Sequence, residues 1–204
     1  MKVSAEFVTS AIDAAGFPRE RLPELALVGR SNVGKSSLIN ALVRLKVART
    51  SAAPGKTRLA NFYRVAPEGA PPFYLVDLPG YGYARGGEAS AREFQAITGA
   101  YFARPNKVPG TFFGEMVPGT FLLVDSRHPG LDSDLHAWRW LESLDIPCTV
   151  VATKLDKLSR AERTRHLKEL ERLHASPVLG VSAQTGEGLK ELWERIATRL
   201  KPQR

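Results

Sequence analysis

The chain has 204 residues, of which 43% are hydrophobic and 25% are charged, which is enough for one well-packed α/β domain. A single cysteine, Cys148, excludes a disulfide framework and favours a reducing cytoplasm. The sequence shows neither an apolar run long enough to span a bilayer nor a signal-peptide pattern, so we expect no membrane partner. The net charge of +8 suits a protein that contacts RNA.

The first predicted elements surround a glycine-rich loop. We expect residues 1–23 to form an N-terminal leader, weakly amphipathic near 7–15, and the apolar run 25–28 to form a buried strand. Residues 29–36 fit the pattern G-x-x-x-x-G-K-[ST] and lead into a helix that continues to about Arg44. A glycine loop between a strand and a helix directs backbone N–H groups at a polyphosphate. The predicted phosphate-binding residues are Gly29, Arg30, Ser31, Asn32, Val33, Gly34, Lys35 and Ser36, with Lys35 on the terminal phosphates and the Ser36 hydroxyl on Mg²⁺.

Two short strands are predicted next, at 61–65 and 73–76, after a polar loop that covers 46–59. Because their connection is short, we expect these two strands to be antiparallel. The second strand ends in Asp77-Leu78-Pro79-Gly80. An aspartate at this place can bind Mg²⁺ through water, and the Gly80 N–H can donate to a γ-phosphate, so this segment can distinguish a triphosphate from a diphosphate.

The middle of the chain contains a short repeat. Residues 108–113 recur nine positions later as residues 117–122, and only the second copy continues into an apolar run. We therefore assign a strand to 120–124 and treat 108–116 as an inserted loop, preceded by a helix at 88–103. The loop either packs back on the domain or forms an exposed contact point. Deleting it and measuring ribosome binding would distinguish the two.

Base recognition is predicted at the end of a later strand, 148–152, which runs into Thr153-Lys154-Leu155-Asp156. The Asp156 carboxylate can accept two hydrogen bonds from guanine, whereas adenine offers no matching donors, so ATP would be rejected. The Lys154 stem can cover the base plane. After a further strand, the segment Val181-Ser182-Ala183 can bring a backbone N–H near Ala183 to the guanine carbonyl oxygen.

Three more helices complete the prediction, at 131–144, 159–174 and 188–200. The first is expected to have Asp132 or Ser133 as its N-cap, and the second carries Ser159 with Glu162 three residues later, the pattern of a capping box.

Four motifs thus lie, in order, at the carboxyl ends of predicted strands, which is the edge where ligands bind in open α/β sheets. The predicted fold is a three-layer α/β P-loop NTPase domain (a G domain) that spans 1–204 as one domain. Its sheet is mostly parallel, with one antiparallel edge strand and helices on both faces.

The chain resembles the EngB/YihA-type GTP-binding proteins of the Era-like group of translation-factor-related GTPases. The resemblance covers nearly the whole chain and rests on residues 7–10, 27–40, 54–57, 61–62, 77–84, 125–128, 153–156 and 181–183. It implies a GTP- and Mg²⁺-dependent switch that binds the large ribosomal subunit, through rRNA and ribosomal proteins, and assists its assembly, with a role in septation. The alternative is a GTP-regulated module in cell division without a stable ribosomal partner. An ATP-using kinase is disfavoured by Asp156, and a monomer is the default.

The resemblance also assigns a switch segment and draws attention to three further residues, Tyr81, Asn32 and Thr153. Thr57 would complete Mg²⁺ coordination when the γ-phosphate is present, within the segment Gly55, Lys56, Thr57, Arg58 and Leu59. Tyr81 stands where Ras-like GTPases have a water-orienting glutamine, so unassisted hydrolysis should be slow and no catalytic residue is assigned. Asn32 matches the asparagine that helps to hold K⁺ in some related GTPases. Thr153 replaces the commoner asparagine and lacks the amide expected to brace the nucleotide loop.

Overall fold

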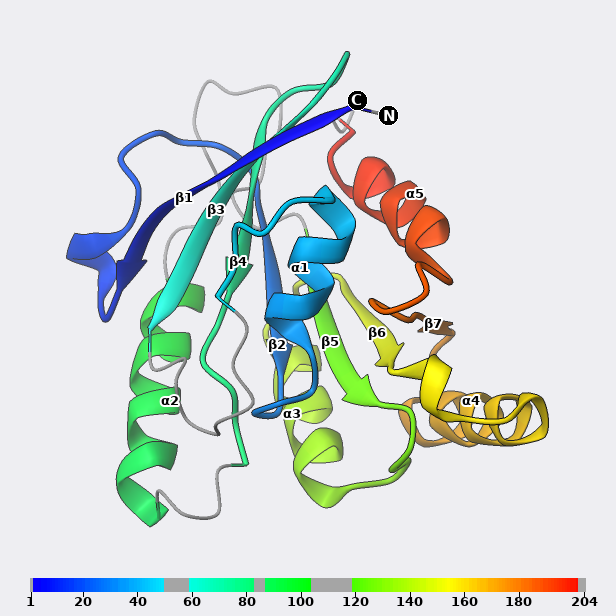
Figure 1. The fold of residues 1–204 in the computed structure, drawn as a ribbon. Coiled ribbons are helices and arrows are strands. Elements are labelled where there is room, and N and C mark those ends of the chain that lie inside the picture. Colours follow the sequence, from blue (N-terminus) through cyan, green and yellow to red (C-terminus); the bar gives the residue numbers. More distant parts are fainter. Residues whose placement is uncertain (1, 50–58, 83–86, 104–118, 202–204) are drawn as a thin grey trace.

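The computed structural model describes residues 2–49, 59–82, 87–103 and 119–201. They form a seven-stranded sheet in the order β1-β3-β4-β2-β5-β6-β7 (Figure 1). The strands are β1 (Val3–Ala11), β2 (Glu24–Gly29), β3 (Ala60–Pro67), β4 (Phe73–Asp77), β5 (Gly119–Asp125), β6 (Cys148–Thr153) and β7 (Val178–Gly180). The helices are α1 (Lys35–Val43), α2 (Gly87–Phe102), α3 (Asp132–Glu142), α4 (Arg160–His174) and α5 (Leu189–Arg199), with short 3₁₀ turns at Ala14–Gly16 and Leu155–Lys157.

The sheet is parallel except at β3, which runs antiparallel to both of its neighbours, β1 and β4. The predicted fold class is therefore confirmed, including the antiparallel pairing of β3 and β4, but the antiparallel strand is second from the edge and not the edge strand that was predicted, because β1 pairs outside it. The expected leader forms β1, which pairs along the outer side of β3 and takes the edge position. Strands β2 and β5 are buried along their whole length, which explains their near-continuous apolar sequences.

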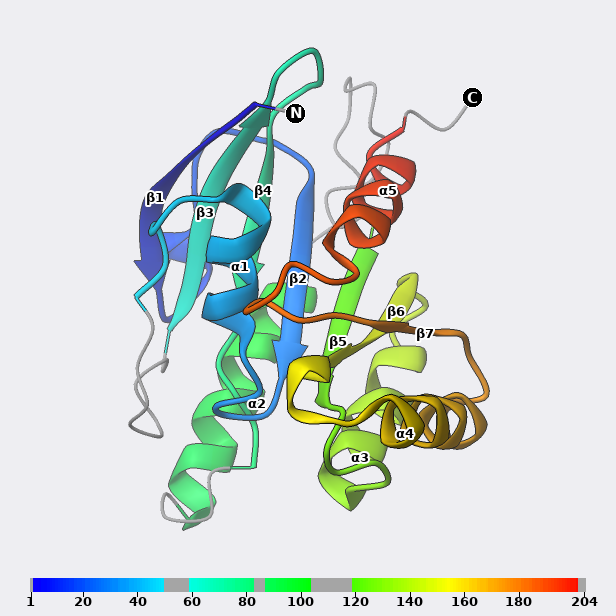
Figure 2. The same ribbon diagram turned by 45° about the vertical axis from the view of Figure 1, so that its right-hand side comes forward.

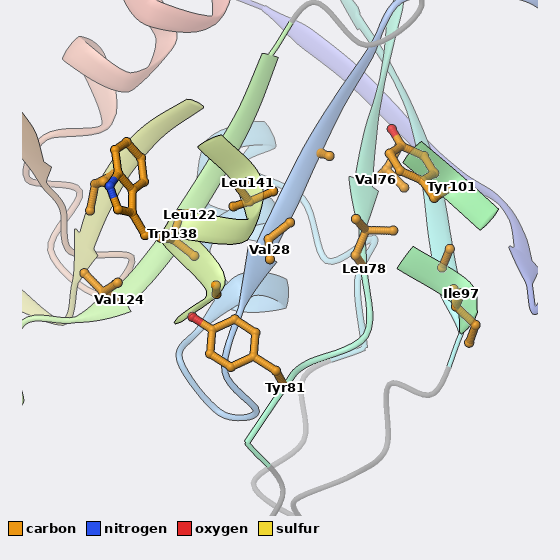
Figure 3. Close-up of a cluster of buried hydrophobic side chains, with 14 of the residues drawn as sticks. Val28, Val76, Leu78, Tyr81, Ile97, Tyr101, Leu122, Val124, Trp138 and Leu141 are labelled. Atoms are coloured by element: carbon orange, nitrogen blue, oxygen red, sulfur yellow. The ribbon is translucent and has the colours of Figure 1, made fainter. Parts of the chain in front are cut away.

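Helices cover both faces of the sheet, α1 and α5 on one and α2 and α3 on the other (Figures 1 and 2). On the first face Leu38 of α1 and Ile196 of α5 are buried in one cluster, and the indole N–H of Trp193 donates to the Leu42 carbonyl at 3.1 Å. On the second face Trp138 of α3 lies beside Leu122 and Val124 of β5, and Tyr101 of α2 lies beside Val76 of β4, all within one buried cluster (Figure 3). The two clusters hold the sheet between two helical layers, as expected for a three-layer α/β domain.

The predicted N-terminal cap is confirmed for α4 and is wrong for α3. The capping box of α4 is confirmed, because the Ser159 hydroxyl accepts from the Glu162 N–H and the Glu162 carboxylate accepts from the Ser159 N–H. The predicted N-cap of α3 is wrong: Leu131 occupies the cap position without a side-chain cap bond, and Asp132 is already helical. The acidic first turn of α3 still places negative charge at the positive end of the helix dipole.

Two further sequence interpretations can be placed in the fold. Cys148 is half-buried at the start of β6, and burial raises the pKa of its thiol to about 12, which fits a packing role rather than a reactive one. The inserted loop at 108–116 lies outside the described residues. No helix within the described ranges is long and apolar enough to cross a membrane.

Candidate functional site: a phosphate and base site at the sheet edge

The predicted motifs meet because of strand direction. β2, β4, β5 and β6 run parallel and are hydrogen-bonded neighbours, so their carboxyl ends lie along one edge of the sheet. These ends carry Gly29, Asp77, Asp125 and Thr153, and the loop of residues 29–36 links β2 to α1 at the same edge (Figure 1).

Glycine is required in this phosphate-binding loop (residues 29–36) for two different reasons. A Cβ on Gly29 would lie 2.7 Å from the Leu123 carbonyl oxygen, so the end of β2 has no room for a side chain. Gly34 has open space around it but a φ of 111°, a backbone conformation that side chains rarely adopt. Asn32 also has a positive φ, 63°, which asparagine tolerates better than most residues. The loop therefore turns sharply before α1 begins at Lys35.

Lys35, Ser36 and Asp77 form a buried polar group beneath this loop. The Lys35 amine donates to the Gly29 carbonyl at 3.3 Å and lies 4.0 Å from Asp77, whose other oxygen accepts from the Ser36 hydroxyl at 2.8 Å. Burial lowers the pKa of Lys35, although Asp77 opposes it, and burial raises the pKa of Asp77 against the effects of Lys35 and Ser36. The attraction between Lys35 and Asp77 therefore offsets only part of the cost of burying their two charges.

The Asp77 Oδ1 atom is buried and has no hydrogen-bond partner. A buried unpartnered carboxylate oxygen is costly, and a divalent cation reached through water would supply its missing partner. A carboxylate beside a serine hydroxyl is the oxygen donor set that Mg²⁺ takes in phosphate sites. The residues present thus fit the predicted Mg²⁺ site at Ser36 and Asp77.

Gly80 lies against the phosphate-binding loop, where a Cβ would come within 2.7 Å of the Ser31 nitrogen. The next carbonyl, that of Tyr81, accepts from the Ser31 N–H at 3.0 Å. The Tyr81 ring turns into the core (Figure 3), where its hydroxyl donates to Asp134 at 3.0 Å. Burial raises the pKa of Tyr81, so the ring stays neutral. The side chain is thus engaged in the core and cannot orient an attacking water at the Gly80 backbone.

On the base side the key carboxylate is held in place. Asp156 accepts a 2.7 Å hydrogen bond from the Ser182 hydroxyl and pairs with Lys157 at 3.3 Å. Ser182 is fully buried, and its oxygen accepts in turn from the N–H groups of Gln184 and Thr185. The hydrogen bond from Ser182 contributes most to lowering the pKa of Asp156, so the carboxylate is ionised as guanine recognition needs. Sequence reasoning gave Ser182 only a backbone role.

The end of β6 braces the phosphate-binding loop directly. The Thr153 hydroxyl lies 2.7 Å from the Val33 carbonyl, and the Lys154 amine donates to the Asn32 carbonyl at 2.7 Å. Thr153 lacks the amide of the commoner asparagine, as noted from the sequence, but its hydroxyl reaches the loop by itself. Lys154 also donates to Asp125 at 2.9 Å, a residue quoted in the family motif 125–128 but given no role.

Some predicted residues contribute no side chain to the site. Leu78, Leu155 and Val181 are buried in the core, so they can offer only backbone groups. Pro79 is buried as well, whereas Ala183 is half-buried and Leu59 lies half-buried directly before β3. The rest of the predicted switch segment, Gly55, Lys56, Thr57 and Arg58, lies outside the described residues.

The fold and this site define a P-loop GTPase. Residues 24–154 match the model of a protein family described as "50S ribosome-binding GTPase". The chain is 43% identical over 200 residues to the probable GTP-binding protein EngB of Solibacter usitatus, covering 98% of this chain and 97% of that protein. It is 46% identical to the EngB protein of Pelotomaculum thermopropionicum, with 96% of each chain covered.

The chain therefore belongs to the EngB family of GTP-binding proteins, and it is a GTPase of that family. A crystal structure of a probable GTP-binding protein engB has the same fold, with a TM-score of 0.65 at 24% identity, covering 87% of this chain and 98% of that one.

Proposed function

We propose that this GTPase is a switch that binds the large ribosomal subunit in its GTP form, assists assembly of the subunit and leaves after hydrolysis. The observation that carries the switch is the ionised Asp156 carboxylate on the same sheet edge as Lys35 and Asp77, whose Oδ1 has no hydrogen-bond partner. The ribosomal partner is supported by the family description of 50S ribosome binding and by the net charge of +8.

Different residues are proposed to bind the base, the phosphates and Mg²⁺. Asp156 would accept hydrogen bonds from guanine, and Lys35 would leave its carbonyl partners for the terminal phosphates. Ser36 and, through water, Asp77 would hold Mg²⁺, which supplies positive charge against the charge that develops on the phosphates. Gly80 would donate its N–H to the γ-phosphate. Thr57 is proposed as the residue that joins Mg²⁺ only in the GTP form, so Thr57→Ala should abolish the affinity preference for GTP-form ligands.

Slow unassisted hydrolysis is part of the proposal, because Tyr81 donates to Asp134 in the core. Asn32 is proposed to help hold a K⁺ ion, and this ion would supply positive charge that the site lacks for hydrolysis. GTPase rates measured in K⁺ and Na⁺ buffers should then differ, and equal rates would exclude this role for Asn32.

Co-sedimentation with purified large subunits at two salt concentrations tests the ribosomal partner. The runs use a non-hydrolysable GTP analogue, GDP and no nucleotide. Salt-resistant binding that favours the GTP form is expected, whereas nonspecific binding to RNA phosphates falls steeply with salt. Binding that ignores nucleotide and disappears at the higher salt would contradict the proposal. It would favour instead a GTP-regulated module in cell division. A monomeric protein of the cytoplasm is proposed in either case.

A further inference from the structure

Among the residues that the structure describes near the site, Asp125 at the end of β5 accepts the most hydrogen bonds of any carboxylate, yet the GTPase mechanism above does not use it. It is 7% exposed and accepts from four N–H donors. Three of them belong to Arg127: its backbone N–H at 3.1 Å, its Nε at 2.9 Å and its Nη2 at 2.7 Å. The fourth is the Lys154 amine at 2.9 Å. The bidentate arginine fixes the plane of the carboxylate as well as its position.

The carboxylate carries a full charge. Burial by itself would raise the pKa of Asp125, but the hydrogen bonds from Arg127 and Lys154 outweigh it and hold the pKa well below the ordinary value. Asp125 therefore stays ionised at any pH at which the protein works. An ionised and geometrically fixed acceptor makes a strong, directional partner for the lysine amine.

Lys154 passes this constraint to the phosphate-binding loop. Its amine donates both to Asp125 Oδ2 and, at 2.7 Å, to the carbonyl of Asn32. Lys154 and Asn32 each have a φ of 63°, so both sit in a backbone conformation that needs support from its surroundings. Lys154 can link Asp125 to the Asn32 carbonyl because its amine has three protons to donate.

We propose that Asp125 and Arg127 are positioning residues that hold Lys154 on the Asn32 carbonyl and thereby set how fast the site releases guanine nucleotide. The loop keeps its left-handed turn at Asn32 only while the lysine is held on both sides. Loosening the lysine would speed release of GDP and GTP alike, because the contact is to the loop and not to the γ-phosphate. Guanine selection would stay with Asp156.

The proposal rests only on guanine-nucleotide binding, which membership of the GTPase family shows, and not on the ribosomal partner. Release of a fluorescent N-methylanthraniloyl-GDP, chased with excess GDP in a stopped-flow instrument, measures it on the full chain. Asp125→Asn keeps the shape but places an amide NH₂ against the donors of Arg127 or Lys154, and it should release GDP about tenfold faster. Arg127→Gln, which leaves Asp125 its lysine, should release it about threefold faster.

A matched control is Arg172→Gln. This exposed arginine makes a bidentate contact to Glu169 on α4, away from the nucleotide loops, and its loss should leave the release rate unchanged. Thermal unfolding of each variant checks that it is folded. Release rates of Asp125→Asn and Arg127→Gln within twofold of the unmodified protein would overturn the proposal.

A double-mutant cycle separates positioning from a general structural effect. If Asp125 acts through Lys154, the variant Asp125→Asn combined with Lys154→Met should release GDP no faster than Lys154→Met alone. If the effects of the two substitutions on the release rate multiply, Asp125 acts by another route and the proposal is overturned. The ratio of affinities for GDP and xanthosine diphosphate should be the same in Asp125→Asn as in the unmodified chain. A changed ratio would place Asp125 in base selection instead.

Discussion

The two halves of the nucleotide site are built differently. On the base side the carboxylates of Asp125 and Asp156 are held by arginine, lysine or serine donors, and their pKa values lie below the ordinary range. On the phosphate side Asp77 keeps one buried oxygen without a partner, and burial raises its pKa while lowering that of Lys35. In the proposed mechanism the base side is therefore held in position before ligand arrives, whereas phosphate and Mg²⁺ would complete the phosphate side.

This difference has a consequence for how the site should respond to ligand. Pre-paired groups lose little on binding, so the base side contributes selectivity at small reorganisation cost. The under-compensated pair of Lys35 and Asp77 gains partners only when the anionic phosphates and their cation bind. Affinity for nucleotide should thus depend mostly on the phosphate side, and the choice of base on the other.

The largest expected effect is on base choice. Asp156→Asn replaces the acceptor of two guanine hydrogen bonds with a group that suits xanthine, so GDP affinity should fall on the order of a thousandfold while xanthosine diphosphate binding improves. Competition of both diphosphates against the fluorescent GDP measures it. If the variant keeps its preference for guanine, the base-recognition assignment is wrong.

Next in size is the loss of the buried lysine. Lys35→Met removes the amine next to Asp77 and should weaken binding of GDP and GTP by about 3 kcal/mol, roughly a hundredfold, as when one partner of a buried charge pair is lost. Equilibrium titration with the fluorescent nucleotides gives the value. Lys190→Met is the control, since this exposed lysine has only a 4.0 Å contact to Glu194. Unchanged affinity in Lys35→Met would mean that the phosphates bind elsewhere.

A smaller and more selective effect is expected at Gly80. In Gly80→Ala the new methyl group would meet the Ser31 backbone, within 2.7 Å of its nitrogen, and backbone cannot yield as a flexible side chain can. We expect GTP-analogue affinity to fall about tenfold with little change for GDP, an energetic loss of about 1.4 kcal/mol. Calorimetry with both ligands measures the ratio. Equal losses for the two nucleotides would assign Gly80 to the general shape of the loop instead.

An effect of similar size concerns the stability of the ligand-free protein. Because the folded pKa of Asp125 lies below its unfolded value, its contribution to stability is complete above the unfolded pKa and is lost as pH falls through the folded pKa. Asp125→Asn should lower stability at pH 7 by about 1.5 kcal/mol, the usual size for charged hydrogen bonds. Its urea midpoint should then fall less than that of the unmodified chain between pH 5 and pH 3. If the urea midpoints of the variant and the unmodified chain fall equally with pH, Asp125 is not held by these hydrogen bonds.

The effect of pH on the stability contribution of Asp77 is opposite to that for Asp125. Its folded pKa is raised, so its ionised form costs stability above the unfolded pKa, and the cost disappears as the pH falls and the group is protonated. The two aspartates, at the ends of β4 and β5, should therefore affect acid stability in opposite directions.

Local patterns predicted most of the fold and the centre of the site. The phosphate-binding loop, the apolar runs of β2 and β5 and the capping box of α4 depend on residues near each other in sequence, and each appears where predicted. β1 was harder to foresee because Phe7 and Val8 at its centre are both exposed, which interrupts the alternation of half-buried and exposed residues along the rest of the strand. The N-cap of α3 differed because the helix begins at Asp132, one residue earlier than an Asp132 cap and two residues earlier than a Ser133 cap would require.

By itself the sequence determined the order of the motifs, the glycines of the loop and the position of Asp156, the residue proposed to recognise the base, and hence predicted a guanine-nucleotide site on a parallel sheet. Only the tertiary structure decided which groups hold that site in shape. The Thr153 hydroxyl meets the Val33 carbonyl across 120 residues of chain, Lys154 bridges Asp125 and the loop, and Tyr81 turns inward to Asp134. Such contacts have no local signal, because hydrogen-bond partners far apart in sequence are selected by strand order and packing rather than by spacing.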